Sequence, residues 1–238
     1  MFGDPSAAIG THPWMERTNG TLTPRERRLL LRPLAATHAV NAWGRLSTLL
    51  RLNSGRRAPA IRLRPAPTSD LTRAAESLAR NRLSPAVLNH AHRTYAFGAA
   101  LGQLSGYDVD RDLLYAAAML HDIGLAAPVP RVDFTMVGAR AARDLAEQVG
   151  LSSTATDPLL TAITLHHTPG VTLASGAVAY LLSAGAGLDV VGLQSWRLPP
   201  GFLASVTSTY PRLGFKREIT AAFRAEAAHV PAGRVAFL

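Results

Sequence analysis

Apolar side chains recur along this chain at intervals of three and four residues, in blocks separated by Gly, Pro and polar clusters. This period is typical of helices that bury one face. The sequence therefore predicts a succession of helices. We expect them over residues 23–52, 68–82, 84–106, 110–122, 134–149, 156–167, 173–191, 202–210 and 212–229.

Several of these blocks begin with a recognisable helix start. Thr23 precedes Pro24, and Glu26 stands three residues after Thr23, which is the pattern of a capping box with proline in the first turn. Pro33 lies inside the same block and is expected to kink or divide that helix. Helix starts are also predicted at Ser84 and Thr156, each with a proline in the first turn, and at Asp110, which acts as a cap without proline.

The amino-terminal quarter differs from the rest of the chain. Residues 1–20 show little period and are expected to be irregular, and residues 53–67 are rich in Pro, Gly and Arg, as linkers are. We therefore expect a basic extension over residues 1–64, irregular and then helical. A single domain, including the helical tail, is expected over residues 65–238.

The composition narrows the kinds of site that the chain can build. At 238 residues and 47% hydrophobic side chains, the chain can bury a sizeable core. It has no Cys, so disulfides, thiolate metal sites and cysteine nucleophiles are excluded. The apolar runs are too short to span a bilayer, and residues 1–20 hold no continuous apolar core of the secretory kind. A cytoplasmic protein without a membrane span is expected.

The net charge of +9 is concentrated in the extension. Residues 1–64 carry eleven Arg against three acids, a net +8, while residues 65–238 carry a net +1. The cluster Arg25, Arg27, Arg28 and Arg32 is interpreted as a solvated helix face, because no aromatic residues alternate with it as in single-strand binders. Nucleic acid is not expected as a partner. Whether this helix packs on the domain, a second subunit or an acidic surface stays open, and so does a homo-oligomer.

The strongest chemical signal is the pair His121-Asp122, at which the apolar run 113–120 stops. Such a pair at the inner end of a buried helix needs a partner for its charge. Its companions are His90, the pair His166-His167, and Asp189 at the end of another apolar run. Imidazole and carboxylate together suit a divalent ion such as zinc, iron or manganese.

The order His90, His121-Asp122, Asp189 resembles the HD superfamily of metal-dependent hydrolases, over roughly residues 84–192. The resemblance implies an all-α helical bundle, preceded here by a helical extension. It implies His90, His121, Asp122 and Asp189 as ligands of one divalent ion, zinc or iron before manganese. The runs 89–93 and 162–167 are most similar to the cyanamide-hydratase-like branch.

Further side chains are candidates for roles around the ion. Arg93 shares a helix face with His90 and could bind substrate, whereas His92 points elsewhere. Adjacent histidines on a helix differ by about 100°, so at most one of the pair 166–167 points straight at the ion. The resemblance implies His166 as the inward member, an acid/base group unless it is simply packed, and leaves His167 as the weaker, substrate-side candidate. Asp122 could also orient a water, and the alternative for Asp189 is a helix cap.

These features favour a small neutral substrate. An HD site would use a metal-bound hydroxide at neutral pH. Phosphohydrolase members commonly carry Lys after the His-Asp-x-Gly motif, and here Leu125 stands there. No His lies between Asp122 and His166, which favours one metal over two. The expected function is a hydrolase or hydro-lyase similar to cyanamide hydratase. The alternatives are a phosphohydrolase of a phosphomonoester or nucleotide, and a non-enzymatic HD module.

Overall fold

The structure is a computed structural model that describes residues 8–50, 52, 61–199 and 201–238. Within these ranges the chain is helical and holds no strand, only an isolated bridge between Val129 and Val132. The predicted all-α fold is confirmed. The helices are α1 His12–Thr18, α2 Pro24–Leu49, α3 Asp70–Arg82, α4 Pro85–Ser105, α5 Arg111–Leu120, α6 Ile123–Ala126, α7 Phe134–Gln148, α8 Ser153–Leu165, α9 Ala177–Val191, α10 Phe202–Thr209, α11 Phe215–His229 and α12 Arg234–Phe237, with short 3-10 turns η3 Leu173–Ser175 and η4 Ser195–Arg197.

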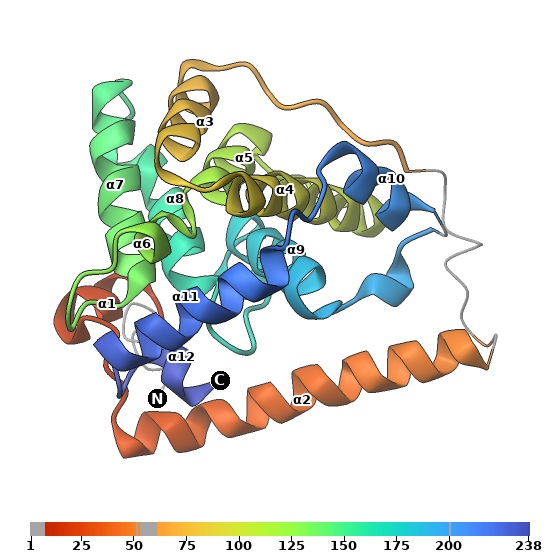
Figure 1. Cartoon of the computed structure of the whole chain (residues 1–238), viewed down its shortest axis with the longest axis horizontal. Coiled ribbons are helices and arrows are strands. Elements are labelled where there is room, and N and C mark those ends of the chain that lie inside the picture. The colour runs from red at the N-terminus through yellow and green to blue at the C-terminus, as the bar shows by residue number, and fades with distance from the viewer. Residues whose placement is uncertain (1–7, 51, 53–60, 200) are drawn as a thin grey trace.

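The helices α4 and α9 cross at the centre of the bundle, with α5 and α8 beside them and α11 across one side (Figure 1). Two glycines allow α4 and α9 to touch backbone to backbone. A Cβ on Gly185 would lie 2.2 Å from the carbonyl oxygen of Thr94, and one on Gly98 would lie 2.6 Å from that of Leu181. No larger residue fits at these positions without a shift of a helix.

Most predicted helix starts are confirmed by cap geometry. Ser84 accepts a hydrogen bond from the amide of Val87, and Asp110 accepts two from the first turn of α5. Gly106 ends α4 with a φ of 66°, in the left-handed region that glycine adopts without strain. These local signals therefore fix the two helices that carry His90 and lead to His121.

The predicted start of α8 at Thr156 is wrong. The helix begins at Ser153, with Ser152 as its cap, and it continues through Pro158. Proline is tolerated there because the bond that it removes would go to the carbonyl of Thr154, an exposed residue in the first turn that water can reach. The hydroxyl of Thr156 bonds back to Ser152 rather than capping a helix of its own.

The expectation of an irregular segment over residues 1–20 is wrong for α1; residues 1–7 lie outside the described ranges. Trp14 and Met15 of α1 are buried with Leu22, Leu30 and Met136. A helix of seven residues is too short to show a period in the sequence, and its stability comes from this burial. The start of the extension is thus packed on α7.

The helix α2 runs as one element from the predicted capping box through Pro33, so Pro33 does not divide it. Its buried residues are Leu30, Gly44 and Ser47, and most of the apolar side chains expected on its buried face are exposed. The predicted linker falls largely on residues outside the described ranges, and residues 61–67 have no regular structure. The division at residues 64 and 65 stays a prediction.

None of the described helices combines the length and the apolar character needed to cross a bilayer.

Candidate metal centre

Three of the predicted ligands meet at the centre of the bundle. Nε2 of His90, on α4, lies 3.2 Å from Nε2 of His121, directly after α5. An oxygen of Asp122 lies 3.4 Å from each of these nitrogens. All three side chains are buried, and their ligand atoms lie within 4.8 Å of one another. Among the described residues, this is the group of His and carboxylate side chains with metal-binding geometry.

The chain turns sharply after this pair, and Gly124 makes the turn possible. Asp122 is followed by the short helix α6, which passes against the first residue of α7. A Cβ on Gly124 would lie 2.1 Å from the carbonyl oxygen of Phe134. Glycine at this position therefore allows α6 and α7 to close behind Asp122, and any larger residue would push the pair out of place.

The hydrogen bonds of the two histidines select, for the neutral rings, the tautomer with the proton on Nδ1. Nδ1 of His90 lies 2.7 Å from Asp189, and Nδ1 of His121 lies 2.8 Å from the carbonyl of Ala118. Both partners are acceptors, so each Nδ1 carries the proton and each Nε2 presents a lone pair. Burial lowers the pKa of His121, which keeps its ring neutral. Two lone pairs 3.2 Å apart, beside a carboxylate, fit a cation between them.

A third imidazole joins the group from α8. His166 donates from Nδ1 to the carbonyl of Ile163, and its Nε2 lies 3.7 Å from Asp122. Burial and the neighbouring His121 hold the pKa of His166 well below its usual value. The structure thus points His166, not His167, toward Asp122. Its acid/base role stays a prediction.

His167 faces the other way. Its ring packs against Phe134 and Phe223, and its Nε2 is buried without a hydrogen-bond partner among the described residues. Burial and the charge of Arg234 lower the pKa of His167 to about 4. The neutral ring of His167 thus packs between two phenyl rings. These contacts give no support to the predicted contact of His167 with substrate.

Asp189 lies behind His90 rather than beside Asp122. It accepts two hydrogen bonds from Arg93, both 2.8 Å long, and a salt bridge of 3.0 Å from Arg212. Burial acts to raise the pKa of Asp189, but the bonds from His90 and Arg93 hold it far below its usual range. Asp189 is therefore an ionised acceptor, and its hydrogen bond fixes the orientation of the His90 ring. It is outside the group of three, and its role as a fourth ligand stays a prediction.

Arg93 is fully buried and its donors are engaged. Besides Asp189, it donates to the carbonyls of Tyr210 and Pro211, in the segment before α11. These contacts hold Asp189 and the tail together, so the predicted contact of Arg93 with substrate gains no support from them. His92 stacks on Tyr210 at 4.7 Å and does not join the group, as expected for a side chain that points elsewhere.

Two side chains that shape the site were not found from the sequence. Phe215, at the start of α11, stacks on the ring of His90 with centroids 4.4 Å apart. Arg234, at the start of α12, is fully buried and donates to Asp133 and to the carbonyl of Thr164. Asp133 caps α7 directly before Phe134, a signal visible in the sequence, but nothing near Arg234 indicated that it is buried.

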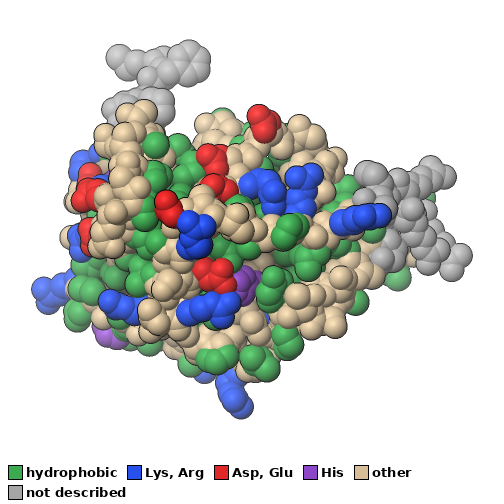
Figure 2. Space-filling view, turned by 90° about the horizontal axis from the view of Figure 1, so that it is seen from above, with side chains coloured by type: hydrophobic (Ala, Val, Ile, Leu, Met, Phe, Trp, Pro, Cys, Tyr) green, Lys and Arg blue, Asp and Glu red, His purple; other side chains and the backbone are tan. Residues whose placement is uncertain are grey.

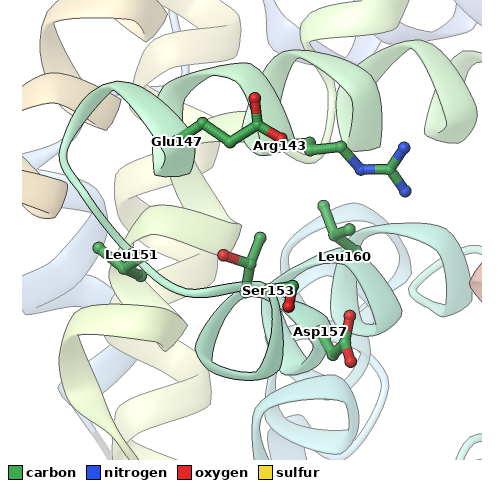
Figure 3. Close-up of a pocket in the computed structure, with 7 residues that line it drawn as sticks. Arg143, Glu147, Leu151, Ser153, Asp157 and Leu160 are labelled. Carbon is green, nitrogen blue, oxygen red and sulfur yellow. The ribbon is translucent and has the colours of Figure 1, made fainter.

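A cavity of about 230 Å³ lies elsewhere, between α7 and α8 (Figure 3). It is lined by Arg143, Glu147, Leu151, Ser153, Thr156, Asp157 and Leu160. None of the predicted site residues lines it. This cavity is therefore separate from the metal group.

Glu226 of α11 makes the stability of the tail depend on pH. One of its oxygens accepts from the amide of Phe134 at 2.8 Å, while the other is buried without a partner among the described residues. Burial raises the pKa of Glu226 from its usual 4.5 to about 7. Because the folded chain holds this proton more tightly than the unfolded chain, the cost of ionisation is absent below about pH 4.5, grows up to pH 7 and stays constant above it.

Glu226→Gln keeps the accepting oxygen and removes the charge. We expect it to raise the free energy of unfolding by about 1–3 kcal/mol at pH 8 and to leave it nearly unchanged at pH 4. Urea unfolding followed by circular dichroism at the two pH values measures this. Glu218→Gln on the same helix is the control. A gain that is equal at both pH values would contradict the expectation.

The comparisons with known proteins agree with this geometry. The family model described as "HD domain" matches residues 87–193. Two curated proteins of Saccharomyces cerevisiae, cyanamide hydratase DDI2 and cyanamide hydratase DDI3, are each 25% identical to the chain over 155 residues, which is 63% of this chain and 69% of each relative. The matched segment contains His90, His121, Asp122, His166 and Asp189. Residues 87–193 therefore match the HD domain family, and the chain is similar to cyanamide hydratases.

Proposed function

We propose that this chain adds water to a small neutral molecule with a nitrile or cyanamide group. In this proposal, His90, His121 and Asp122 hold one divalent ion, zinc or iron, and Asp189 is either a fourth ligand or the support of His90. The observation that carries the proposal is the convergence of two unprotonated Nε2 atoms and a carboxylate 3.2–3.4 Å apart. The two curated cyanamide hydratases support the choice of substrate.

Asp122 and His166 are placed to handle the proton that the attacking water gives up. An ion bound there would act as a Lewis acid and lower the pKa of a coordinated water toward about 7. Asp122 lies between the ligand pair and His166, so its carboxylate can orient that water through the oxygen 3.7 Å from His166 Nε2. His166 is neutral and can accept a proton at Nε2, then return it to the substrate nitrogen that hydration leaves basic.

The charges around the site favour a neutral substrate over a phosphate. Arg93, Arg212 and Arg234 are the guanidinium groups bonded to site and supporting residues, and each already pairs with a carboxylate. Leu125 occupies the position at which phosphohydrolases commonly have Lys. Phe215 and Phe134 pack on His90 and His166, so the nearby surface is apolar. A di- or triphosphate would lack free donors here.

A substrate panel tests the proposal. Purified chain loaded with zinc or iron is offered cyanamide, a small nitrile, a phosphomonoester and a nucleotide, and the hydrated product and inorganic phosphate are measured. We expect urea from cyanamide and no phosphate. His166→Gln should lower the rate by about 10²–10⁴-fold and leave the metal content unchanged. Release of phosphate with cyanamide untouched would reverse the assignment.

A further inference from the structure

The ring of His90 is held along its edge by a single hydrogen bond from a side chain. Its Nδ1 atom lies 2.7 Å from Asp189. The second side-chain torsion of a histidine, which sets the tilt of the ring, has broad energy minima. Because a hydrogen bond tolerates deviations of about 30° from linearity, the bond to Asp189 restrains this tilt only loosely. A contact with the flat face of the ring is needed to fix it.

Phe215 supplies this contact. The centroids of the two rings are 4.4 Å apart and their planes differ by 16°, so the rings are stacked. Phe215 is 2% exposed and packs with the buried side chains of Ala86 and Ile219. A larger tilt would push the ring of His90 into a phenyl ring that close packing holds in place. The stacking therefore restrains the tilt that the hydrogen bond leaves loose.

A strained turn brings Phe215 to this position. It lies in residues 210–215, which connect α10 to α11 and are called the strap below. Leu213 and Gly214 have φ angles of 48° and 81°, both in the left-handed region. Leucine rarely adopts this region, and the side chain of Leu213 is 60% exposed, so its own packing does not explain the turn. Backbone strain of this kind persists where surrounding contacts hold it, and it is typical of functional sites.

Arg93 joins the two supports of the His90 ring. Its guanidinium group binds both oxygens of Asp189 at 2.8 Å and donates to two backbone carbonyls of the strap. The central carbon of the same group lies 5.3 Å from the centroid of the Phe215 ring. One fully buried cation therefore contacts the residue at the edge of the His90 ring and the residue on its face.

Two further side chains fasten the strap to α4 and α9. Asn89 donates to the carbonyl of Pro211 at 2.8 Å. Arg212 forms a salt bridge of 3.0 Å with the carboxylate of Asp189 and donates to its backbone carbonyl at 3.2 Å. The strap is thus fastened at the residues that surround His90. It lies outside residues 87–193, so the segment that matches the HD domain does not itself supply these contacts.

We propose that Phe215 is a positioning residue for the metal centre. It fixes the tilt of the His90 ring while Asp189 holds the edge, so that Nε2 stays aimed at the group that His90 forms with His121 and Asp122. This proposal rests on the metal centre proposed above. Groups that orient a metal-binding histidine commonly account for about 10–100-fold of the metal affinity. Loss of the phenyl ring should therefore weaken metal binding in a chain that stays folded.

Metal binding and docking of the strap should then reinforce each other. An ion held by Nε2 of His90 fixes the ring on which Phe215 stacks, so it favours the docked strap. Such coupling is reciprocal, and each event strengthens the other by the same factor. Trypsin cleaves after Lys and Arg, and the side chains of Arg212, Lys216 and Arg217 are exposed in and next to the strap. Cleavage there reports how often the strap opens.

Titration of the metal-free chain with zinc or ferrous iron against a chromogenic chelator gives the first test. Phe215→Leu should weaken binding by about 10–100-fold. Phe202→Leu is the matched control and should leave the affinity unchanged, because it removes a buried phenyl ring that contacts Phe97 instead. Circular dichroism verifies that each variant is folded. Phe215→Met, which fills the space without a flat face, replaces Phe215→Leu if that variant does not fold.

Two negative results would have different meanings. A Phe215 variant that is folded and binds the ion as tightly as the wild type would overturn this proposal, and Phe215 would then only fill space. A wild-type chain that binds neither zinc nor iron would overturn the metal centre itself.

Limited proteolysis with trypsin gives the second test. A saturating ion should slow cleavage after Arg212, Lys216 and Arg217 by about the same 10–100-fold in the wild type, and by much less in Phe215→Leu. Lys and Arg side chains lie at several separate places on the upper face of the molecule (Figure 2), so the fragments are identified by mass. Cleavage after the exposed Arg73 of α3 is the internal control and should not depend on the ion. Equal protection of the strap in both chains would contradict the coupling.

Discussion

His121→Ala is expected to abolish both metal binding and turnover. The variant removes one of the two Nε2 lone pairs that face each other 3.2 Å apart. Because a bound ion contributes several kcal/mol of transition-state stabilisation, its loss should lower the rate by about 10³-fold or more. Elemental analysis should show the metal content fall from near one ion per chain to background, and the cyanamide assay should show the loss of rate.

Two further variants control this result. His92→Ala removes a buried histidine of α4 outside the group and should keep both metal and activity. Asp189→Asn should weaken metal binding by about 10–100-fold if Asp189 acts through His90. A His121→Ala variant that retains its ion and its rate would show that the reactive centre lies elsewhere.

Arg234→Ala is expected to cause the largest loss of stability. Arg234 is fully buried and donates to both oxygens of Asp133, at 2.9 and 3.3 Å. Removing it leaves a buried carboxylate without its partner, which typically costs about 3–5 kcal/mol. Urea unfolding monitored by circular dichroism measures this free energy. The same variant should also loosen α12, because the bonds to Thr164 and Thr168 are lost.

A surface ion pair provides the comparison. Arg73 pairs with Asp70 on the exposed side of α3, so Arg73→Ala should cost less than about 1 kcal/mol. Adding Asp133→Asn to Arg234→Ala should recover part of the lost stability, since the unpaired charge is removed. If the free energy of unfolding of Arg234→Ala lies within 1 kcal/mol of the wild-type value, the buried pair does not stabilise the tail.

Local signals in the sequence predicted the elements that carry the site. Ser84 and Asp110 cap their helices through bonds that span only a few residues, so the residue types alone identified the starts of α4 and α5. The order of His90, His121 and Asp122 gave the resemblance to the HD family, whose model matches residues 87–193. The ligand role of each stays to be measured.

Contacts between distant parts of the chain could not be predicted in this way. Phe215 stacks on His90 and Arg234 bonds to Asp133, although about a hundred residues or more separate each pair. A period of three and four shows that a helix has an apolar face, but it does not show whether that face turns inward. This is why the helix over residues 23–52 was expected to bury its apolar face, whereas apolar side chains of α2 such as Trp43 are exposed.

The glycines between α4 and α9 have a consequence for anyone who tries to make this protein more robust. Replacing Gly by Ala within a helix ordinarily gains about 0.4–1 kcal/mol. Gly185 and Thr94 touch one helical turn from the contact between Asp189 and His90. An added methyl group on Gly185 would push α9 away from α4 and move Asp189 away from the ring of His90. The usual stabilising substitution of Gly by Ala would therefore be expected to lengthen the contact between Asp189 and His90.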